Sequence, residues 1–380
     1  MGLVLDSDQA LLRDSALEFA RGRLPVANLR KLRDSADATG FDREAWQEMA
    51  GLGWTGMLIP DELGGNGFGF FGLGLVSEAL GRTLAASPLF STVVLSGSAL
   101  ALAVSNEAAR SLLEQIAAGD VVVALAAAEA ATHRPTEVAT SARREGTAYV
   151  LNGRKRFVID GHVADKLLVV ARTSGRSPDG SGLSLFVVDA GAVGVQRRRL
   201  SMADSRNSAD IDFANVAVDS SALLGHEGAA GAYLDRVYDR ASILLAAEMF
   251  GMAQAAFETT LAYLKERKQF GVPIGSFQAL KHRAVHMYIE IELAKSVLYE
   301  ALTALDEGRE ADVPRLASLC KARLNDALQM ITNEAVQLHG GIGMTDNIDV
   351  GLYLKRARVV MAMLGNASFH RDRYAALQGF

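Results

Sequence analysis

The chain of 380 residues contains a single cysteine, Cys320, so no disulfide can form within it. A chain this poor in cysteine is typical of a cytosolic protein. Cys320 falls in a stretch with helical periodicity, residues 316–328, and we expect it to be a small packing residue. The first residues, MGLVLDSD, lack a basic segment followed by an apolar one, so we expect no signal peptide and a cytoplasmic location.

Long apolar runs and dense basic patches are also lacking. Stretches such as 121–128 are too short to cross a bilayer, so we predict no membrane span. The net charge is −5 and the basic residues are dispersed, which argues against nucleic-acid binding. The one basic run, 197–199, favours a solvated strand or loop edge, with contact to an anionic substrate tail as the alternative.

Motifs for nucleotides and metals are missing as well. The chain has neither a P-loop nor a Gly-x-Gly-x-x-Gly run after a predicted strand, which argues against nucleotide hydrolysis and Rossmann-type NAD binding. His282 and His286 are four residues apart, a spacing that metal ligands also use. No carboxylate motif accompanies them, so we predict solvated or interface histidines and no metal site.

The hydrophobic pattern divides the chain into three parts, and its length exceeds what one core usually holds. Helical spacing dominates the first part, with Asp6 or Ser7 as N-cap of the first helix. Short strands separated by turn residues follow, and helical spacing then returns until the end. The predicted fold class is α+β and multi-domain. The predicted domains are an N-terminal helical domain (1–119), a small antiparallel β domain (120–222) and a C-terminal four-helix bundle (223–380).

Within these parts the elements can be placed more closely. In the β domain, residues 148–159 read AYVLNGRKRFVI, which predicts two strands around an Asn-Gly turn. After Gly228, four long amphipathic segments with brief connections predict an antiparallel bundle. These segments are 229–267, 276–306, 313–339 and 347–378.

Two segments of the bundle carry the candidate chemistry. Residues 267–278 read RKQFGVPIGSFQ, a charged helix end, a Gly-Pro break and a new helix. An arginine at such an end can bind a phosphate through charge-assisted hydrogen bonds, although an ordinary helical hairpin explains the pattern too. Residues 337–345 read QLHGGIGMT, a helix end running into a glycine-rich turn. The glycines either admit a ligand close to the backbone or merely terminate the helix.

Taken together, these segments resemble the acyl-CoA dehydrogenase family of flavoproteins. That family has an Arg-x-x-Phe-Gly…Phe-Gln block and a Gln-x-x-Gly-Gly-x-Gly block at about this separation. The resemblance covers nearly the whole chain, and the sequence pattern most resembles that of the small-subunit type of pimeloyl-CoA dehydrogenase. Further matching stretches are 59–65 (IPDELGG), 150–155 (VLNGRK), 211–218 (IDFANVAV) and 224–228 (LGHEG).

The resemblance implies FAD-dependent α,β-dehydrogenation of an acyl-CoA thioester, with an electron-transfer flavoprotein as acceptor. It implies that Arg267 holds the FAD pyrophosphate and that Phe270 packs on the cofactor. Gln278 would reach the phosphates or the adenine side, and Gln337 with Gly340 and Gly341 would contact the adenosine end. In the family these groups come from a neighbouring subunit, so a homo- or heterotetramer is implied.

The sequence departs from the family where a subunit would use its own flavin. The usual base is the Glu of a Tyr-Glu-Gly-Thr motif, and Leu364 stands there in the run MLGNA. The second known location for the base matches Ala241. Phe157 stands where the family has a flavin-side Trp, and Ile159 replaces a Thr that would offer a hydroxyl to the flavin. The Thr-Glu-Pro…Gly-Ser-Asp loop survives only as residues 127–131, AAEAA.

Another base is conceivable on the first bundle helix. Glu248 lies in the apolar run 244–250, seven residues after Ala241, and so on the same helical face. A carboxylate in such a run is costly unless it is paired or functional. The alternative is a structural pair with Arg283 or Lys321. Asp239 is a weaker candidate that we expect to face solvent.

The sequence therefore leaves several functions open. The chain is one subunit of a heteromeric flavoenzyme whose partner supplies the base, or a self-sufficient enzyme that uses Glu248. Alternatively it is a catalytically silent structural subunit that completes the FAD site of a catalytic one, or a related flavin monooxygenase. The backbone N–H of Leu364 could still bind the thioester oxygen, since that donor needs no side chain.

Overall fold

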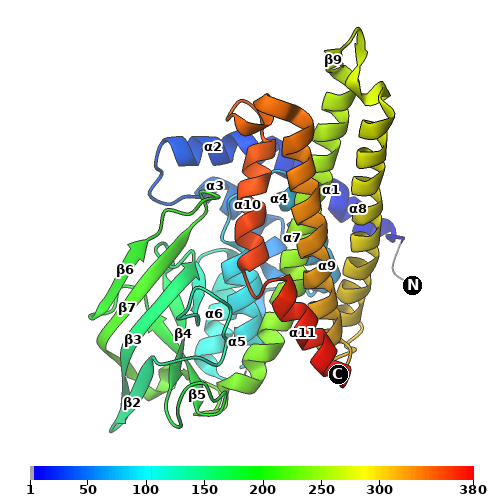
Figure 1. Cartoon of the computed structure of the whole chain (residues 1–380). Coiled ribbons are helices and arrows are strands. Elements are labelled where there is room, and N and C mark those ends of the chain that lie inside the picture. Colours follow the sequence, from blue (N-terminus) through cyan, green and yellow to red (C-terminus); the bar gives the residue numbers. More distant parts are fainter. Residues whose placement is uncertain (1–3, 104) are drawn as a thin grey trace. The chain divides into compact units, whose positions relative to one another are not determined.

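The computed structural model describes residues 4–103 and 105–380, which fold into two compact units that interleave along the sequence (Figure 1). One unit contains the described residues up to Asp34 together with 70–85 and 242–380. The other contains 35–69 and 86–241. The predicted boundaries at 119 and 222 stay a prediction, because these units divide the chain differently.

The second unit is built on one mixed sheet with the order β6-β7-β3-β2-β4-β5-β8. Its neighbours are antiparallel, except that β1 runs parallel to β4 and β2 makes one parallel bridge to β4. Figure 1 shows β6, β7 and β3 side by side. The strands are β1 (Val123–Ala126), β2 (Ser141–Glu145), β3 (Ala148–Ile159), β4 (Lys166–Arg172), β5 (Leu183–Asp189), β6 (Val195–Arg199), β7 (Ser208–Asp219) and β8 (Leu223–Leu224).

The predicted Asn-Gly hairpin is wrong. Residues 148–159 form one continuous strand, β3, and its register with β7 shifts between Leu151 and Gly153. Asn152 accepts a hydrogen bond from the backbone N–H of Asn215 (2.9 Å), so the amide serves this bulge instead of a turn. The chain reverses earlier, at Gly146 between β2 and β3. The basic run 197–199 lies on β6, an exposed edge strand, as predicted.

Helices complete the second unit. The N-cap side chains of Asp42 and Asn106 accept the backbone N–H groups of Ala45 and Ala109, which fixes the starts of α3 and α6. The segments are α3 (Arg43–Gly51), η1 (Trp54–Gly56), η2 (Asp61–Leu63), the π-helical η3 (Leu89–Gly97), α5 (Ser98–Leu102), α6 (Glu107–Ala118) and η4 (Ser220–Ala222).

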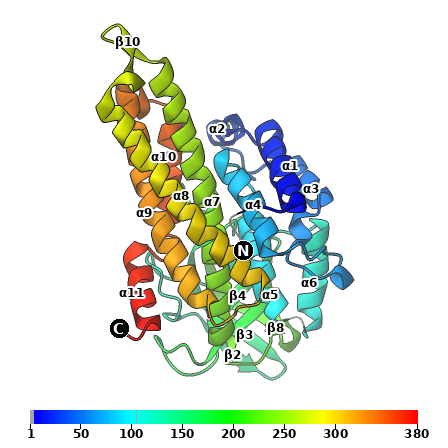
Figure 2. The same cartoon turned by 90° about the vertical axis from the view of Figure 1, so that its right-hand side faces the viewer.

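The first unit is the predicted helical bundle, and the fold class is confirmed. Helix α9 packs against α8, α10 and α11 (Figures 1 and 2). The fourth predicted segment is wrong as one helix, since it breaks at Leu364, which has φ +56°. The helices are α7 (Ala230–Glu266, of which 242–266 belong to this unit), α8 (Gln278–Asp306), α9 (Val313–His339), η6 (Gly340–Met344), α10 (Val350–Ala362) and α11 (Ala367–Leu377).

N-terminal helices join this bundle. Asp6 caps α1 through a capping box with Gln9, as the sequence predicts. Helix α4 crosses α7 so closely that a Cβ at Gly81 would lie 2.2 Å from the carbonyl oxygen of Glu248. A Cβ at Gly251 would lie 1.9 Å from that of Glu78, so glycine is required on both helices. The N-terminal helices are α1 (Ser7–Arg23), α2 (Val26–Asp34) and α4 (Gly69–Arg82).

Among the residues described, no helix is long and apolar enough to cross a membrane. The same residues contain no group of three or more His, Cys, Asp or Glu side chains that could hold a metal ion.

Candidate functional site

The connection between α7 and α8 is a small projecting hairpin at one end of the bundle (Figures 1 and 2). Its strands are β9 (Lys268–Gln269) and β10 (Val272–Pro273), followed by η5 (Ile274–Ser276). At its tip Phe270 has φ +53° and is 92% exposed. Its ring meets that of Phe277 edge-on, with the centroids 6.0 Å apart. A strained, exposed aromatic of this kind is suited to packing against a planar ligand.

Arg267 lies at the base of this hairpin. Its backbone is fixed, because its N–H donates to Tyr263 (2.8 Å) and its carbonyl accepts from Ile274 (2.7 Å). Its side chain is exposed and makes no hydrogen bond or ion pair with any described residue. The exposed side chain of Gln278, the first residue of α8, is likewise without a polar partner in the described chain. Fixed backbone with unpaired donors is what an external phosphate requires.

The glycine-rich segment forms the turn η6 directly after α9. Gly340 has φ +63°, and a Cβ on Gly340 or Gly341 would meet nothing within 4 Å. The positive φ requires glycine at position 340, and the open space lets a ligand approach the backbone of both. Gln337, one turn earlier, is exposed, and its side chain has no polar partner among the described residues.

The structure brings these two segments to the same end of the bundle. The ring of Tyr263 in α7 stacks on that of His339 in α9, with the centroids 4.3 Å apart. The Tyr263 hydroxyl also donates to the His339 carbonyl (3.4 Å). Arg267 comes shortly after Tyr263 in the chain and Gly340 directly after His339, so this stacked pair brings the two segments together. The residues also fit a phosphate-containing cofactor, since they offer a guanidinium and amides without polar partners among the described residues, and open glycine backbone.

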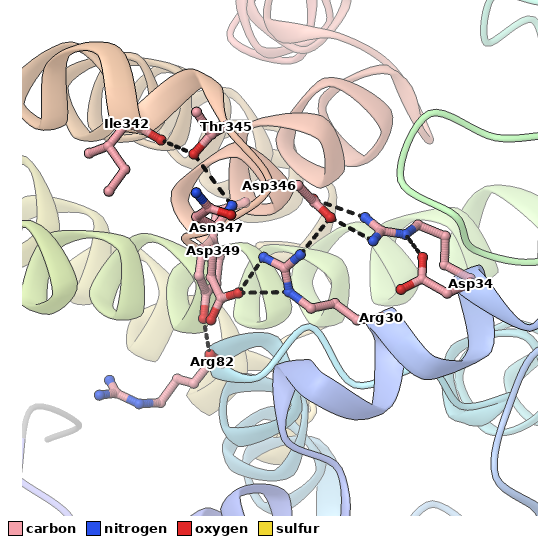
Figure 3. A network of polar contacts seen from close by, with 10 residues as sticks. Arg30, Asp34, Arg82, Ile342, Thr345, Asp346, Asn347 and Asp349 are labelled. Atoms are coloured by element: carbon pink, nitrogen blue, oxygen red, sulfur yellow. Dashed lines mark hydrogen bonds and ion pairs between the residues drawn. The ribbon is translucent and has the colours of Figure 1, made fainter.

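A charged network that the sequence analysis missed holds the chain just after the turn (Figure 3). Arg30 in α2 contacts Asp346 (2.8 Å) and donates two bonds to Asp349 (2.8 and 3.1 Å). Arg33 binds both oxygens of Asp346 (2.7 and 3.0 Å). Hydrogen bonding to Arg33 lowers the pKa of Asp346 to about 2. The spacing of Arg30 and Arg33, three apart on a helix, was the available signal.

The turn between α10 and α11 presents an unusual backbone. Leu364 has φ +56° and Gly365 has φ +105°. The Leu364 carbonyl accepts a hydrogen bond from Nε2 of His370 (2.9 Å). Its backbone N–H has no acceptor among the described residues. The leucine side chain cannot accept a proton, but this N–H is available as a donor to a ligand oxygen.

Glu248 is buried, and its partner is Arg356 on α10. The guanidinium binds both carboxylate oxygens, with Nε to Oε1 at 3.0 Å and Nη2 to Oε2 at 3.1 Å. The partners named from sequence were wrong. Arg283 donates to Glu334 (2.5 Å), and Lys321 binds Asn325 and backbone carbonyls.

This pair bears on the assignment of Glu248 as a base. Bidentate, charge-assisted bonds stabilise the carboxylate, and a base would have to weaken them to take a proton. The geometry favours the structural alternative, and the catalytic role of Glu248 stays a prediction. Asp239, the weaker candidate, is 4% exposed, so the expectation that it faces solvent was wrong.

In the β unit, Phe157 also has a positive φ (+51°) and is 39% exposed. The Arg156 guanidinium lies 5.8 Å from the Phe157 ring centroid. The backbone N–H of Phe157 donates to the Asp210 carboxylate (3.4 Å). In the same unit, the side chain of Glu129 anchors the loop 127–131. Glu129 accepts bonds from the fully buried Lys155 (2.7 Å) and from two backbone N–H groups.

The pKa shifts of Lys155 and Glu129 agree with the contact between the two side chains. Burial lowers the pKa of Lys155 to about 8, and the nearby Glu129 carboxylate opposes that change. Burial would raise the pKa of Glu129, but the Lys155 charge and hydrogen bonds bring it below its usual value. Glu129 therefore holds the loop in place, although the other four side chains of residues 127–131 are alanines.

Comparisons with known proteins cover almost the whole chain. Models described as the N-terminal, middle and C-terminal domains of acyl-CoA dehydrogenase match residues 6–120, 124–216 and 219–377. The chain is 30% identical to a 3-(aryl)acrylate reductase of Clostridium sporogenes, over 94% of each. It is 29% identical to the caffeyl-CoA reductase-Etf complex subunit CarC of Acetobacterium woodii, over 92% of each. The ChsE4-ChsE5 complex of Mycobacterium tuberculosis contains a chain with TM-score 0.87 and 25% identity, covering 100% of this chain and 99% of that one.

Proposed function

Since this chain belongs to the acyl-CoA dehydrogenase family, we propose that it serves in FAD-dependent α,β-dehydrogenation of an acyl-CoA thioester. It is an oxidoreductase of the acyl-CoA dehydrogenase type. Flavin oxidoreductases of this kind remove a proton from the carbon next to the thioester carbonyl and a hydride from the following carbon. FAD, when bound, accepts the hydride, and we propose an electron-transfer flavoprotein as the next acceptor.

The observation that carries the proposal is the exposed Arg267, whose side chain has no polar partner in the described part of the chain, at the same bundle end as the open Gly340–Gly341 backbone. Arg267 would bind the pyrophosphate, where each charge-assisted bond contributes roughly 1.5–3 kcal/mol. Phe270 would pack on the cofactor. Gln278 would bind near the phosphates or adenine, and Gln337 and the two glycines near the adenosine. These groups would serve a neighbouring subunit, whereas Phe157 would contact the flavin of its own subunit.

An exposed apolar face supports this assembly. Val285, Tyr288, Ile289 and Leu293 on α8 follow helical spacing and are each about half exposed, between 47% and 52%. Such a stripe, continuous along a helix, is characteristic of an interface with another chain. A homo- or heterotetramer of acyl-CoA dehydrogenase-like subunits would cover it.

We propose that the assembly is heteromeric and that this chain corresponds to the small-subunit type of pimeloyl-CoA dehydrogenase. Leu364 and Ala241 provide no base, and Glu248 is engaged by Arg356. A partner subunit would then supply the catalytic Glu and most of the flavin cradle. The same observations favour a second candidate, a catalytically silent subunit that completes the partner's FAD site. A self-sufficient homo-oligomer would need Glu248. The acyl group stays open, and we propose a cytoplasmic location.

The experiment compares the purified chain alone with the chain co-expressed with a subunit that carries the Tyr-Glu-Gly-Thr motif. Flavin absorbance and thioester oxidation are measured for both. The heteromeric proposal predicts bound flavin and turnover only in the mixture. Full activity of the chain alone would contradict it. A colourless mixture that lacks turnover would reject the flavoenzyme proposal itself.

If the silent-subunit candidate is correct, activity in the mixture comes only from the partner's active site. Replacing the Glu of the partner's motif by Gln should then abolish turnover completely. Residual turnover that depends on Glu248 of this chain would contradict the silent role.

A further inference from the structure

Lys321 is a fully buried lysine in the middle of α9. Its ammonium lies within hydrogen-bond distance of the Asn325 side chain (3.0 Å) and of the carbonyls of Val360 (3.0 Å), Gly365 (3.2 Å) and Met361 (3.5 Å). No carboxylate pairs with it among the described residues. The cation is therefore directed at backbone oxygens rather than at another charge.

These oxygens belong to one structural feature. Helix α10 ends at Ala362, and its last carbonyls lack partners within the helix, so they carry the negative end of its dipole. A lysine ammonium has three donors and suits that place. Lys321 also reaches Gly365, beyond the helix, and thus binds the chain on both sides of Leu364. The amide of Asn325 adds a bond to Met361 (3.4 Å).

The segment so held needs support, because Leu364 and Gly365 both have positive φ. A leucine is strained in that conformation and adopts it only where the surroundings impose it. His370 holds the Leu364 carbonyl from α11. Between these two fixed points, the Leu364 N–H has no acceptor in the described part of the chain.

We propose that Lys321 is a positioning residue for the substrate: by fixing the carbonyls of Val360 and Gly365, it presents the Leu364 N–H to the thioester carbonyl oxygen. This inference rests on the dehydrogenase function proposed above, in the form in which the thioester binds against this chain's own Leu364 turn, and the silent-subunit candidate excludes it. Burial lowers the pKa of Lys321 to about 7, which reflects the penalty of placing an ammonium in the interior. A buried lysine that only filled space could be replaced by an apolar side chain without that penalty.

The test uses the assembled flavin-containing protein, with Lys321→Met as the variant, because methionine keeps the length and removes the donors. Cinnamoyl-CoA is the probe, with crotonyl-CoA as a smaller second probe. A hydrogen bond to the carbonyl of such a conjugated thioester polarises it and shifts its absorbance to longer wavelength. Thr332→Val is the matched control, because Thr332 is buried in α9 and, among the described residues, its hydroxyl bonds only to the Leu328 carbonyl (2.7 Å).

We expect wild type and Thr332→Val to shift the absorbance of bound probe, and Lys321→Met to bind it with most of the shift lost. We expect kcat of Lys321→Met to fall about tenfold or more with a smaller change in KM, since the donor matters most as charge develops on the oxygen. If Lys321→Met does not fold, Asn325→Leu is used, and a partial loss of the shift is expected.

An unchanged shift in a folded Lys321→Met protein would overturn the inference and leave the proposed function intact. A wild-type assembly that binds a probe without any shift would likewise overturn the inference, whereas an assembly that binds no flavin would contradict the proposed function.

Discussion

Arg356 on α10 holds both carboxylate oxygens of Glu248 on α7, and both residues are almost completely buried. The pair joins α7, the helix that ends just before Arg267, to α10, the helix that precedes the Leu364 turn. A buried pair of this kind is a fixed structural link, and removing one partner leaves the other charge without compensation.

The first prediction concerns the stability of this link. Arg356→Met should lower the free energy of unfolding by about 3–5 kcal/mol, because Glu248 would remain buried without the charge and the two hydrogen bonds of Arg356. The double variant Glu248→Met with Arg356→Met should recover most of that loss, since an apolar pair fills the same space. Urea unfolding of the single and double variants measures the coupling. Simple additivity of the single effects would show that the two side chains do not act as a pair.

The second prediction concerns the chemistry of Glu248. In the assembled protein, Glu248→Gln should keep turnover within about tenfold of wild type, because the base is expected from the partner subunit. The flavin absorbance of the variant serves as the control for an intact cofactor site. A yellow protein in which Glu248→Gln has abolished turnover would establish Glu248 as the base and remove the need for a partner's carboxylate.

A third prediction concerns the network around Asp346. Because the pKa of Asp346 is lowered to about 2 in the folded protein, its stabilising contribution exists above the ordinary value of 3.8 and is lost as pH falls towards 2. Asp346→Asn should therefore mimic acid at neutral pH and speed amide hydrogen exchange in residues 340–349. Asp14→Asn, which breaks the exposed pair with Arg13 (2.8 Å), is the control and should leave that exchange unchanged. If residues 340–349 exchanged equally fast in Asp346→Asn and Asp14→Asn, the network would not stabilise this turn.

A fourth prediction concerns Glu78 in α4, which is 7% exposed. Burial raises its pKa from 4.5 to about 7, against the attraction of Arg82, Arg13 and Lys295. A carboxyl with a raised folded pKa binds more protons in the folded state, so the stability that it confers is present at low pH and falls between 4.5 and 7.

Glu78→Gln should consequently stabilise the protein at pH 8 by on the order of 3 kcal/mol and have little effect near pH 4. Chemical unfolding at the two pH values measures this difference. Glu258→Gln, at an exposed carboxylate that pairs with Arg82, is the control and should show no such pH-dependent gain. A gain of equal size at both pH values would mean that Glu78 is not titrating in this range.

The sequence predicted the fold class because periodicity is strong in long helices and because motif order resembles a known family. It placed the segments 276–306 and 313–339 within two residues of the observed bounds of α8 and α9. It failed at Asn152, where a turn dipeptide serves a bulge, because the bond to Asn215 comes from a distant strand. It also missed the break at Leu364, because a leucine with positive φ is imposed by tertiary contacts from Lys321 and His370.

The site was predictable to a similar degree. The segments around Arg267 and Gly340 were singled out through the resemblance to the family, since their glycines and charges alone also fit an ordinary hairpin and a helix end, and their role in FAD binding stays a prediction. The sequence predicted that Glu248 pairs with a basic residue of the bundle, but the partners that it named were wrong. Sequence alone does not tell which bundle arginine faces Glu248. The sequence indicated that Lys321 is buried, because its helical neighbours Ala317, Leu324 and Leu328 place it on the buried face of α9. We considered Lys321 only as a partner of Glu248 and not for a role of its own.

The most direct test of the central claim is the affinity of the assembled apoprotein for FAD in Arg267→Met, with the adjacent exposed Lys268→Met as control. The account predicts that Arg267→Met weakens FAD binding by roughly 10- to 150-fold, the loss of one or more charge-assisted phosphate bonds, while Lys268→Met binds nearly as wild type. Equal FAD affinity in Arg267→Met and wild type would contradict it.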